Sequence, residues 1–176
     1  MNQNLPPSVD QQRLNAMLAV RNLERRVKSG ANTFYWIAAL SIINSLVYIF
    51  GGGITFVVGL GLTQIVDGVA SGIASGLPSA AAFIRGFGVL INLCIAGVFV
   101  VFGIMAGKYH RWAFIAGMVL YALDAALVLV FQDYLAAIFH LFFLYLLFNG
   151  LRDLGKLLKV PPRPETTPDF PTSIGS

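Results

Sequence analysis

One stretch of the sequence decides the fold: ITFVVGLGLTQIVDGVASGI, residues 54–73. It is apolar enough to compete as a membrane span, since a transmembrane helix needs roughly 17–25 residues of this character. Four other stretches meet the same requirement, and they are residues 34–50, 86–107, 112–131 and 134–151. Whether residues 54–73 cross the membrane decides between four spans and five, and so decides on which side each loop lies.

The composition places the chain in a membrane. Of its 176 residues, 57% are hydrophobic and 11% are charged, whereas a soluble domain carries about 25% charged residues. This balance excludes a soluble enzyme, a disordered protein and a nucleic-acid binder, although the net charge is +4. The length suits one domain. Cys94 is the single cysteine, which excludes a disulfide framework, and we expect it to be a buried small hydrophobe.

The basic residues favour four spans, because the cytoplasmic flanks of membrane helices collect Lys and Arg. The chain has 12 such residues. If residues 54–73 span the membrane, six fall on each side. If they do not, eleven share one side with both termini, and Arg85 alone lies on the other. We therefore expect four spans with both termini cytoplasmic. A fifth span with a polar side facing the bundle is the alternative.

The second half of the deciding stretch is amphipathic. One helical face carries Leu62, Ile65, Val66, Val69 and Ile73, and the other carries Thr63, Gln64, Asp67, Gly68 and Ser71. This pattern is typical of a helix that lies in the membrane interface. We expect an outer interfacial or re-entrant helix over about residues 54–76, ended by Leu77-Pro78-Ser79. Glycines at 68, 72 and 76 allow close helix packing or a loose fit equally.

Two cytoplasmic segments flank the transmembrane domain of residues 31–160. In residues 1–30, Ser8 with Gln11 resembles a capping box and Gly30 is a helix stop. We expect an amphipathic helix on the inner leaflet, where anionic lipid attracts each basic residue by about 1 kcal/mol. A short coiled-coil dimer is the alternative. Residues 161–176 are rich in proline and predict a disordered tail.

Polar side chains deep inside a span are costly, so each needs a partner or a function. The four spans supply Asn44, Asn92, Asp124 and His140. Counted inward from the outer end of each helix, all four lie six or seven residues deep, which is roughly 9–11 Å at the rise of an α-helix. The four-span arrangement thus predicts one polar layer built from four helices.

Asp124 and His140 form the sharpest relation within this layer. The third and fourth spans are a tight antiparallel hairpin whose turn includes Gln132 and Asp133. Residues whose numbers sum to about 265 are level across it, and 124 and 140 sum to 264. A carboxylate and an imidazole that meet in low dielectric share a proton and titrate as a pair.

Two functions follow from such a pair. One is a small proton-coupled transporter or channel subunit that uses Asp124 and His140. The other, which we favour, is a structural clasp in a non-enzymatic scaffold, accessory or membrane-organising protein, because helices in lipid lack a hydrophobic force between them. We find no metal, cofactor or catalytic motif in the sequence. Lys108 and Arg111, in the basic turn after the second span, are candidate contacts for a lipid phosphate.

Three segments resemble small multi-span proteins of bacterial inner membranes that have no known activity: Arg111–Asp124, Phe139–Gly150 and Ser41–Asp67. The resemblance covers about two thirds of the chain. It implies a multi-pass protein of the bacterial inner membrane and supplies no catalytic residues. The expected partners are the lipid bilayer with its anionic lipids at the cytoplasmic face, and either a second copy or another membrane protein.

Overall fold

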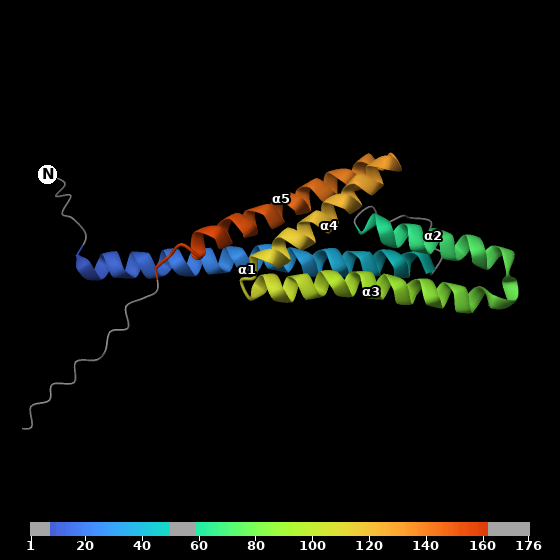
Figure 1. The fold of residues 1–176 in the computed structure, drawn as a ribbon, viewed down its shortest axis with the longest axis horizontal. Helices are drawn as coiled ribbons and strands as arrows, with labels where there is room; N and C mark the ends of the chain where they lie inside the picture. The colour runs from blue at the N-terminus through green and yellow to red at the C-terminus, as the bar shows by residue number, and fades with distance from the viewer. Residues whose placement is uncertain (1–7, 50–58, 162–176) are drawn as a thin grey trace, which may run out of the picture.

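The computed structural model describes residues 8–49 and 59–161. This part of the chain contains α1 (Val9–Ile49), α2 (Gly61–Gly76), the short 3-10 helix η1 (Pro78–Ala80), α3 (Ala81–Gly107), α4 (Arg111–Val130) and α5 (Tyr134–Leu157) (Figure 1). Four of them, α1, α3, α4 and α5, are long and apolar enough to cross a membrane. The predicted all-α bundle of four spans with one additional helix is confirmed.

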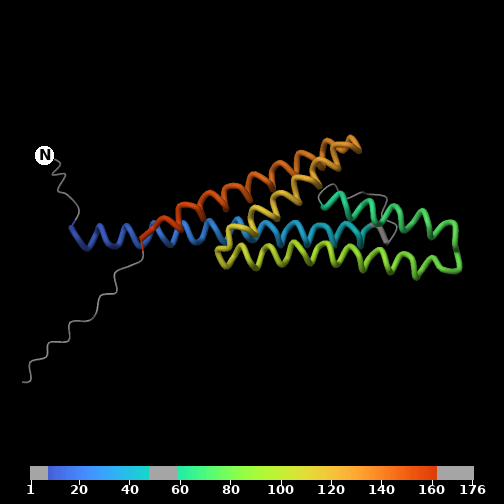
Figure 2. Tube along the Cα trace, viewed as in Figure 1, coloured from blue at the N-terminus to red at the C-terminus, as the bar shows by residue number. Residues whose placement is uncertain are grey.

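The four long helices run alternately up and down. α1 packs against α3 on one side and α5 on another, and α4 packs against α5 (Figure 2). The N-terminal end of α1 and the C-terminal end of α5 therefore point toward the same end of the molecule (Figure 1). Chain ends that lie at the same end of the bundle require an even number of crossings. The four long helices supply that number, and α2 is not a fifth span.

α1 is longer than the sequence suggests. It starts with the predicted capping box, in which Ser8 Oγ accepts from Gln11 N at 3.3 Å and Gln11 Oε1 accepts from Ser8 N at 3.2 Å. The predicted stop at Gly30 is wrong, since the helix runs through it from Val9 to Ile49, 41 residues in all. A Cβ on Gly30 would lie 2.6 Å from the Cα of Gly150. Gly30 is thus the place where α1 and α5 cross backbone to backbone, and not a terminator.

α2 packs lengthwise against the bundle. It runs alongside α3 and does not lie across the ends of the spans (Figures 1 and 2). Thr63 and Asp67 on its polar face are buried in the bundle, whereas Val69 and Ile73 are exposed. In a membrane protein exposed apolar residues face lipid. This orientation therefore buries the polar face of α2 among polar partners and leaves its apolar face toward lipid. With 16 residues, α2 is shorter than a membrane span requires, and of the two predicted placements this packing favours the re-entrant one.

The glycine stripe of α2 makes no close packing contact within the described residues. A Cβ added at Gly68, Gly72 or Gly76 would meet nothing within 4 Å. Cys94 is also on an outer face: it is exposed on α3, and the expectation that it is buried is wrong. Apart from Pro161, the tail of residues 161–176 lies outside the described residues.

An aromatic core joins α1, α3 and α4 in the part of the bundle nearer the chain ends. The Phe34 ring lies 6.4 Å from Phe99, 6.0 Å from Phe102 and 6.0 Å from Phe114, measured between centroids. Gly117 makes room for this cluster, because a Cβ there would lie 2.4 Å from the Phe34 ring. Large rings opposite glycines thus set the spacing between α1, α3 and α4.

Substituting Gly30 by alanine should destabilise the bundle. The added methyl group meets the backbone of Gly150, which cannot move aside as a side chain can, and overpacking of this kind costs about 1–3 kcal/mol. Gly97→Ala on α3 is the matched control, because a Cβ at Gly97 meets nothing within 4 Å. Unfolding in detergent micelles should show a loss for Gly30→Ala and none for Gly97→Ala. Equal effects would contradict the backbone crossing.

Candidate functional site

Asp124 and His140 are in contact across the α4–α5 hairpin, as counting across the turn predicts. His140 Nε2 lies 2.8 Å from Asp124 Oδ2. Both residues are buried, with 7% of Asp124 and 1% of His140 exposed. Gln132, at the turn, has a φ of 59°, and Asp133 caps α5 by accepting from Ala136 N at 3.0 Å. This compact turn fixes the register that makes the pair level.

The hydrogen bonds of the imidazole fix the proton content of the pair. His140 Nδ1 lies 2.7 Å from the carbonyl oxygen of Ala136, which can only accept, so Nδ1 carries a hydrogen. A second hydrogen must then lie between Nε2 and Asp124 Oδ2, because two lone pairs at 2.8 Å would repel. With one shared proton the pair has no net charge, which is the form that a membrane interior tolerates.

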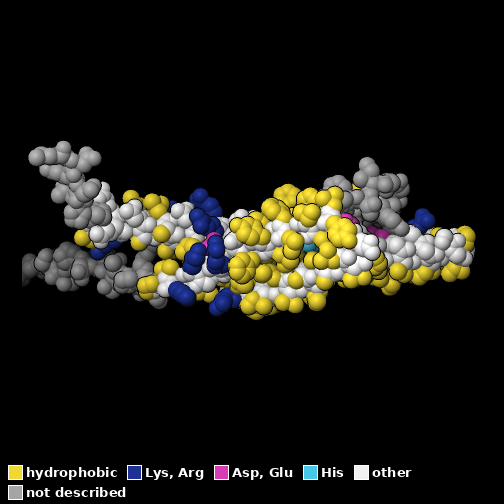
Figure 3. All heavy atoms as spheres, turned by 90° about the horizontal axis from the view of Figure 1, so that it is seen from above, with side chains coloured by type: hydrophobic (Ala, Val, Ile, Leu, Met, Phe, Trp, Pro, Cys, Tyr) yellow, Lys and Arg dark blue, Asp and Glu magenta, His cyan; other side chains and the backbone are white. Residues whose placement is uncertain are grey.

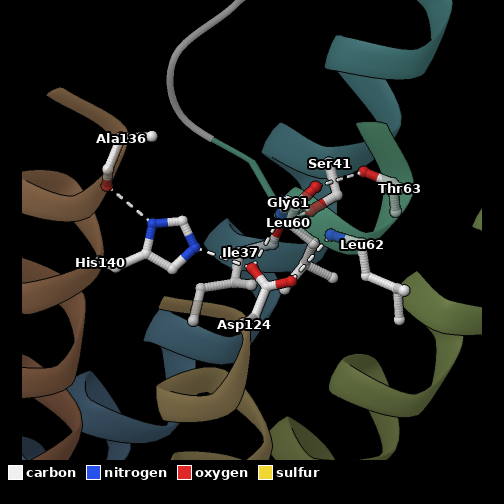
Figure 4. A network of polar contacts seen from close by, with 9 residues as sticks. All are labelled: Ile37, Ser41, Leu60, Gly61, Leu62, Thr63, Asp124, Ala136 and His140. Atoms are coloured by element: carbon white, nitrogen blue, oxygen red, sulfur yellow. Dashed lines mark hydrogen bonds and ion pairs between the residues drawn. The ribbon is translucent and has the colours of Figure 1, made fainter. Parts of the chain in front are cut away.

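Asp124 also caps helix α2. Its Oδ2 accepts from Gly61 N and its Oδ1 from Leu62 N, each at 2.8 Å. Figure 4 shows the carboxylate between the imidazole of His140 and the first turn of α2. The first N–H groups of a helix have no partner within the helix, and Leu60 at the N-cap position supplies none. α4 therefore provides the cap that the sequence of α2 lacks, and the helix dipole favours a negative group there.

Two hydroxyl groups complete the hydrogen bonding at the start of α2. Ser41 Oγ on α1 accepts from Leu60 N at 2.9 Å and donates to the carbonyl oxygen of Ile37 at 2.8 Å. Thr63 Oγ1 donates to the carbonyl oxygen of Leu60 at 2.7 Å (Figure 4). Tertiary contacts from α1 and α4 thus satisfy the polar groups where α2 begins inside the bundle.

The imidazole ring is held from the side as well. The ring of Tyr121 stacks on His140 with a centroid distance of 4.7 Å and an interplanar angle of 18°. Tyr121 lies one helical turn before Asp124 on α4, so one face of α4 positions both partners of His140. The ring of Phe143 contacts Tyr121 edge-on at 6.4 Å. These contacts fix the ring plane that the two hydrogen bonds of His140 need.

A second polar cluster lies farther along α2. Asn92 Nδ2 on α3 lies 2.8 Å from Ser45 Oγ on α1, 2.7 Å from Asp67 Oδ1 and 3.4 Å from the carbonyl oxygen of Thr63. Asp67 is 5% exposed and Asn92 is 2% exposed. Burial raises the pKa of the Asp67 carboxyl, and hydrogen bonds from Ser45 and Asn92 offset part of this effect.

The predicted polar layer is thus two clusters joined by α2. Asp124 and His140 form one, and Asn92 belongs to the other with Asp67. Asn44 is buried on α1, and among the described residues no hydrogen bond joins it to the other three. Of the four residues of the predicted polar layer, Asp124 and His140 are thus joined directly, and Asn92 is joined to Asp67 of α2.

The other predicted contacts lie on the surface. Lys108 and Arg111 are exposed at the α3–α4 turn. Within residues 8–49 and 59–161, no three His, Cys, Asp or Glu side chains come close enough to hold a metal ion. Chemically, the buried site can exchange a proton and hold a helix end.

Two kinds of partner were not predicted from the sequence. The backbone N–H groups of Gly61 and Leu62 leave no trace in side-chain patterns. The polar face that carries Thr63 and Asp67 is visible in the sequence, but the pattern does not show that Asp67 and Ser45 contact Asn92. Asp153 is a further buried carboxylate, paired with Lys156 Nζ at 2.8 Å.

Asp124→Asn should destabilise the protein by about 2–3 kcal/mol, the size of hydrogen bonds to a buried charged group. The two N–H groups of α2 use different oxygens of Asp124, and Asn replaces one of these oxygens by an NH2 group, which donates, so one N–H group loses its acceptor. Asp133→Asn is the control, because it caps α5 at a partly exposed site where Asn serves about as well as Asp. Denaturant unfolding in micelles measures the difference. A similar loss in both variants would contradict the cap.

A scan against protein-family models finds no match, and neither the search of curated proteins nor the search of solved structures finds a similar chain. Inferences about function therefore rest on the geometry of the two polar clusters.

Proposed function

We propose that this chain is a non-enzymatic integral membrane protein, a scaffold or accessory protein in which the Asp124–His140 pair is a structural clasp. One observation carries the proposal: both carboxylate oxygens of Asp124 accept from the backbone of α2, and both ring nitrogens of His140 are hydrogen-bonded. A transport carboxylate exchanges its partners as the substrate passes. Asp124 cannot exchange its partners without uncapping a helix in an apolar environment.

The clasp would serve a scaffold by fixing α2 against the spans. It holds the lipid-facing side of α2, with Val69 and Ile73, in one orientation. A second copy or another membrane protein would dock against such a presented surface. Apolar side chains beside open glycines are the kind of surface that packs another membrane helix closely.

The orientation we propose places both termini in the cytoplasm of a bacterial inner membrane. Exposed Lys and Arg side chains form a band between the apolar surface and the projecting part of α1 (Figure 3). The exposed basic side chains of the described residues include Lys28, Lys108, Arg111 and Arg152. Basic residues concentrate on the cytoplasmic side and attract anionic lipids there. Lys108 and Arg111 are the candidate lipid-phosphate contacts on the α3–α4 turn.

Reconstitution in liposomes separates the clasp from proton-coupled transport. A pH-sensitive dye inside the vesicles should report the same proton flux with the wild-type protein, with Asp124→Asn and with vesicles without protein. His140→Gln should lower the unfolding temperature in detergent and leave this baseline flux unchanged. A wild-type flux that both variants abolish, although they insert normally, would replace the scaffold by a transporter or channel subunit.

A further inference from the structure

Asp67 is a buried carboxyl group without a cationic partner among the described residues. It is 5% exposed, and the two ion pairs in this part of the chain involve Asp124 and Asp153. A buried carboxylate without a counter-charge is costly, so the neutral acid is favoured. Because the proposed clasp uses Asp124 and His140, Asp67 is available for a role of its own.

The neighbouring amide has an unused acceptor. Asn92 donates through Nδ2 to Asp67 Oδ1 at 2.7 Å and to Ser45 Oγ at 2.8 Å. Its Oδ1 is buried and has no hydrogen-bond partner. A buried acceptor without a partner costs about 1–3 kcal/mol, and such an atom calls for an explanation.

One added hydrogen resolves both problems. We propose that Asp67, Asn92 and Ser45 form a proton-binding site between α2, α3 and α1. Asp67 takes up one proton at Oδ2 from a hydronium ion in the adjacent water: an O–H bond of the hydronium breaks, an O–H bond to Oδ2 forms, and a neutral water molecule is left. The new O–H donates to Asn92 Oδ1 while Asp67 Oδ1 still accepts from Asn92 Nδ2. The acid and the amide then form a ring of two hydrogen bonds, and Ser45 accepts the second N–H of Asn92.

The ionised form cannot make this ring. Without the hydrogen, Asp67 Oδ2 and Asn92 Oδ1 are both acceptors and repel each other. Proton release therefore breaks one of the two hydrogen bonds between Asp67 on α2 and Asn92 on α3. The proton-bound form holds α2 more tightly, so the site couples the pH of the adjacent water to the hold on the re-entrant helix. This inference is independent of the scaffold proposal.

The other charged groups around α2 are few. α1 contributes Ser45, which does not titrate. On α3, Arg85 is exposed and lies about two helical turns before Asn92. On α4, Asp124 caps the start of α2, six residues or about 9 Å along the helix from Asp67, and His140 beyond it shares the proton that leaves that pair neutral. Asp67 is thus the carboxyl group whose proton content changes the α2–α3 contact.

The sign of the pH dependence follows from the raised pKa of Asp67. Below the ordinary Asp pKa, both folded and unfolded chains hold the proton, and the stabilisation is complete. Between the ordinary and the raised value, the unfolded chain loses its proton first. Each pH unit in this window then shifts the unfolding equilibrium by up to about tenfold toward the unfolded state. Above the raised value this contribution is lost.

Asp67→Asn tests the site, because an amide at position 67 can make the same two hydrogen bonds to Asn92 without a titrating proton. In detergent micelles, unfolding of the wild type should lose stability with rising pH relative to this variant. Infrared spectra should contain a protonated-carboxyl band that rising pH removes and that Asp67→Asn lacks. Asp133→Asn, at a partly exposed cap, should retain both the wild-type pH dependence and the band.

The proposal is wrong if the wild type and Asp67→Asn depend on pH in the same way, or if the substitution leaves the carboxyl band unchanged. Should Asp67→Asn fail to fold, Asn92→Leu decides. It removes the amide oxygen, so the carboxyl band of Asp67 should move to the frequency of an acid that donates no hydrogen bond. An unmoved band in Asn92→Leu would equally overturn the acid–amide ring.

Discussion

The fold depends on how a helix can begin inside an apolar bundle. The N–H groups at the start of α2 have no partner within the helix, and in lipid no water replaces one. Asp124 accepts from two of them at 2.8 Å, and His140 shares a proton with the same carboxylate. The cap is thus strong yet without net charge. The stacked ring of Tyr121, the hydroxyl of Ser41 and the tight α4–α5 turn all support this one interaction.

The cap explains the unusual orientation of α2. Once its first turn is fixed against α4, the polar residues Thr63 and Asp67 face the bundle, while Val69 and Ile73 face outward. The polar face then needs partners, and Asn92 and Ser45 provide them. The first cluster supplies a permanent hold on α2. The second supplies a hold that we propose varies with the proton content of Asp67.

Much of this architecture could be predicted from the sequence. The four spans follow from apolar length, and the Asp124–His140 contact follows because a short antiparallel turn leaves one register. The face of α2 could not be predicted, since the same amphipathic pattern suits an interfacial helix and an inward-facing one. Gly30 fits the sequence pattern of a helix stop. Its close backbone contact with Gly150 depends on tertiary packing, which the sequence pattern does not show. The backbone partners of Asp124 on α2 were equally hidden, because backbone N–H groups are the same at every residue.

The central claim is that Asp124 caps α2 inside the bundle, and amide hydrogen exchange tests it most directly. In the wild-type protein in micelles, the amides of Gly61 and Leu62 should exchange slowly, as buried hydrogen-bonded groups do. In Asp124→Asn at least one of the two should exchange much faster, while the amides in the middle of α3 keep their protection. Rapid exchange of both amides in the wild type, or unchanged protection in the variant, would contradict the account.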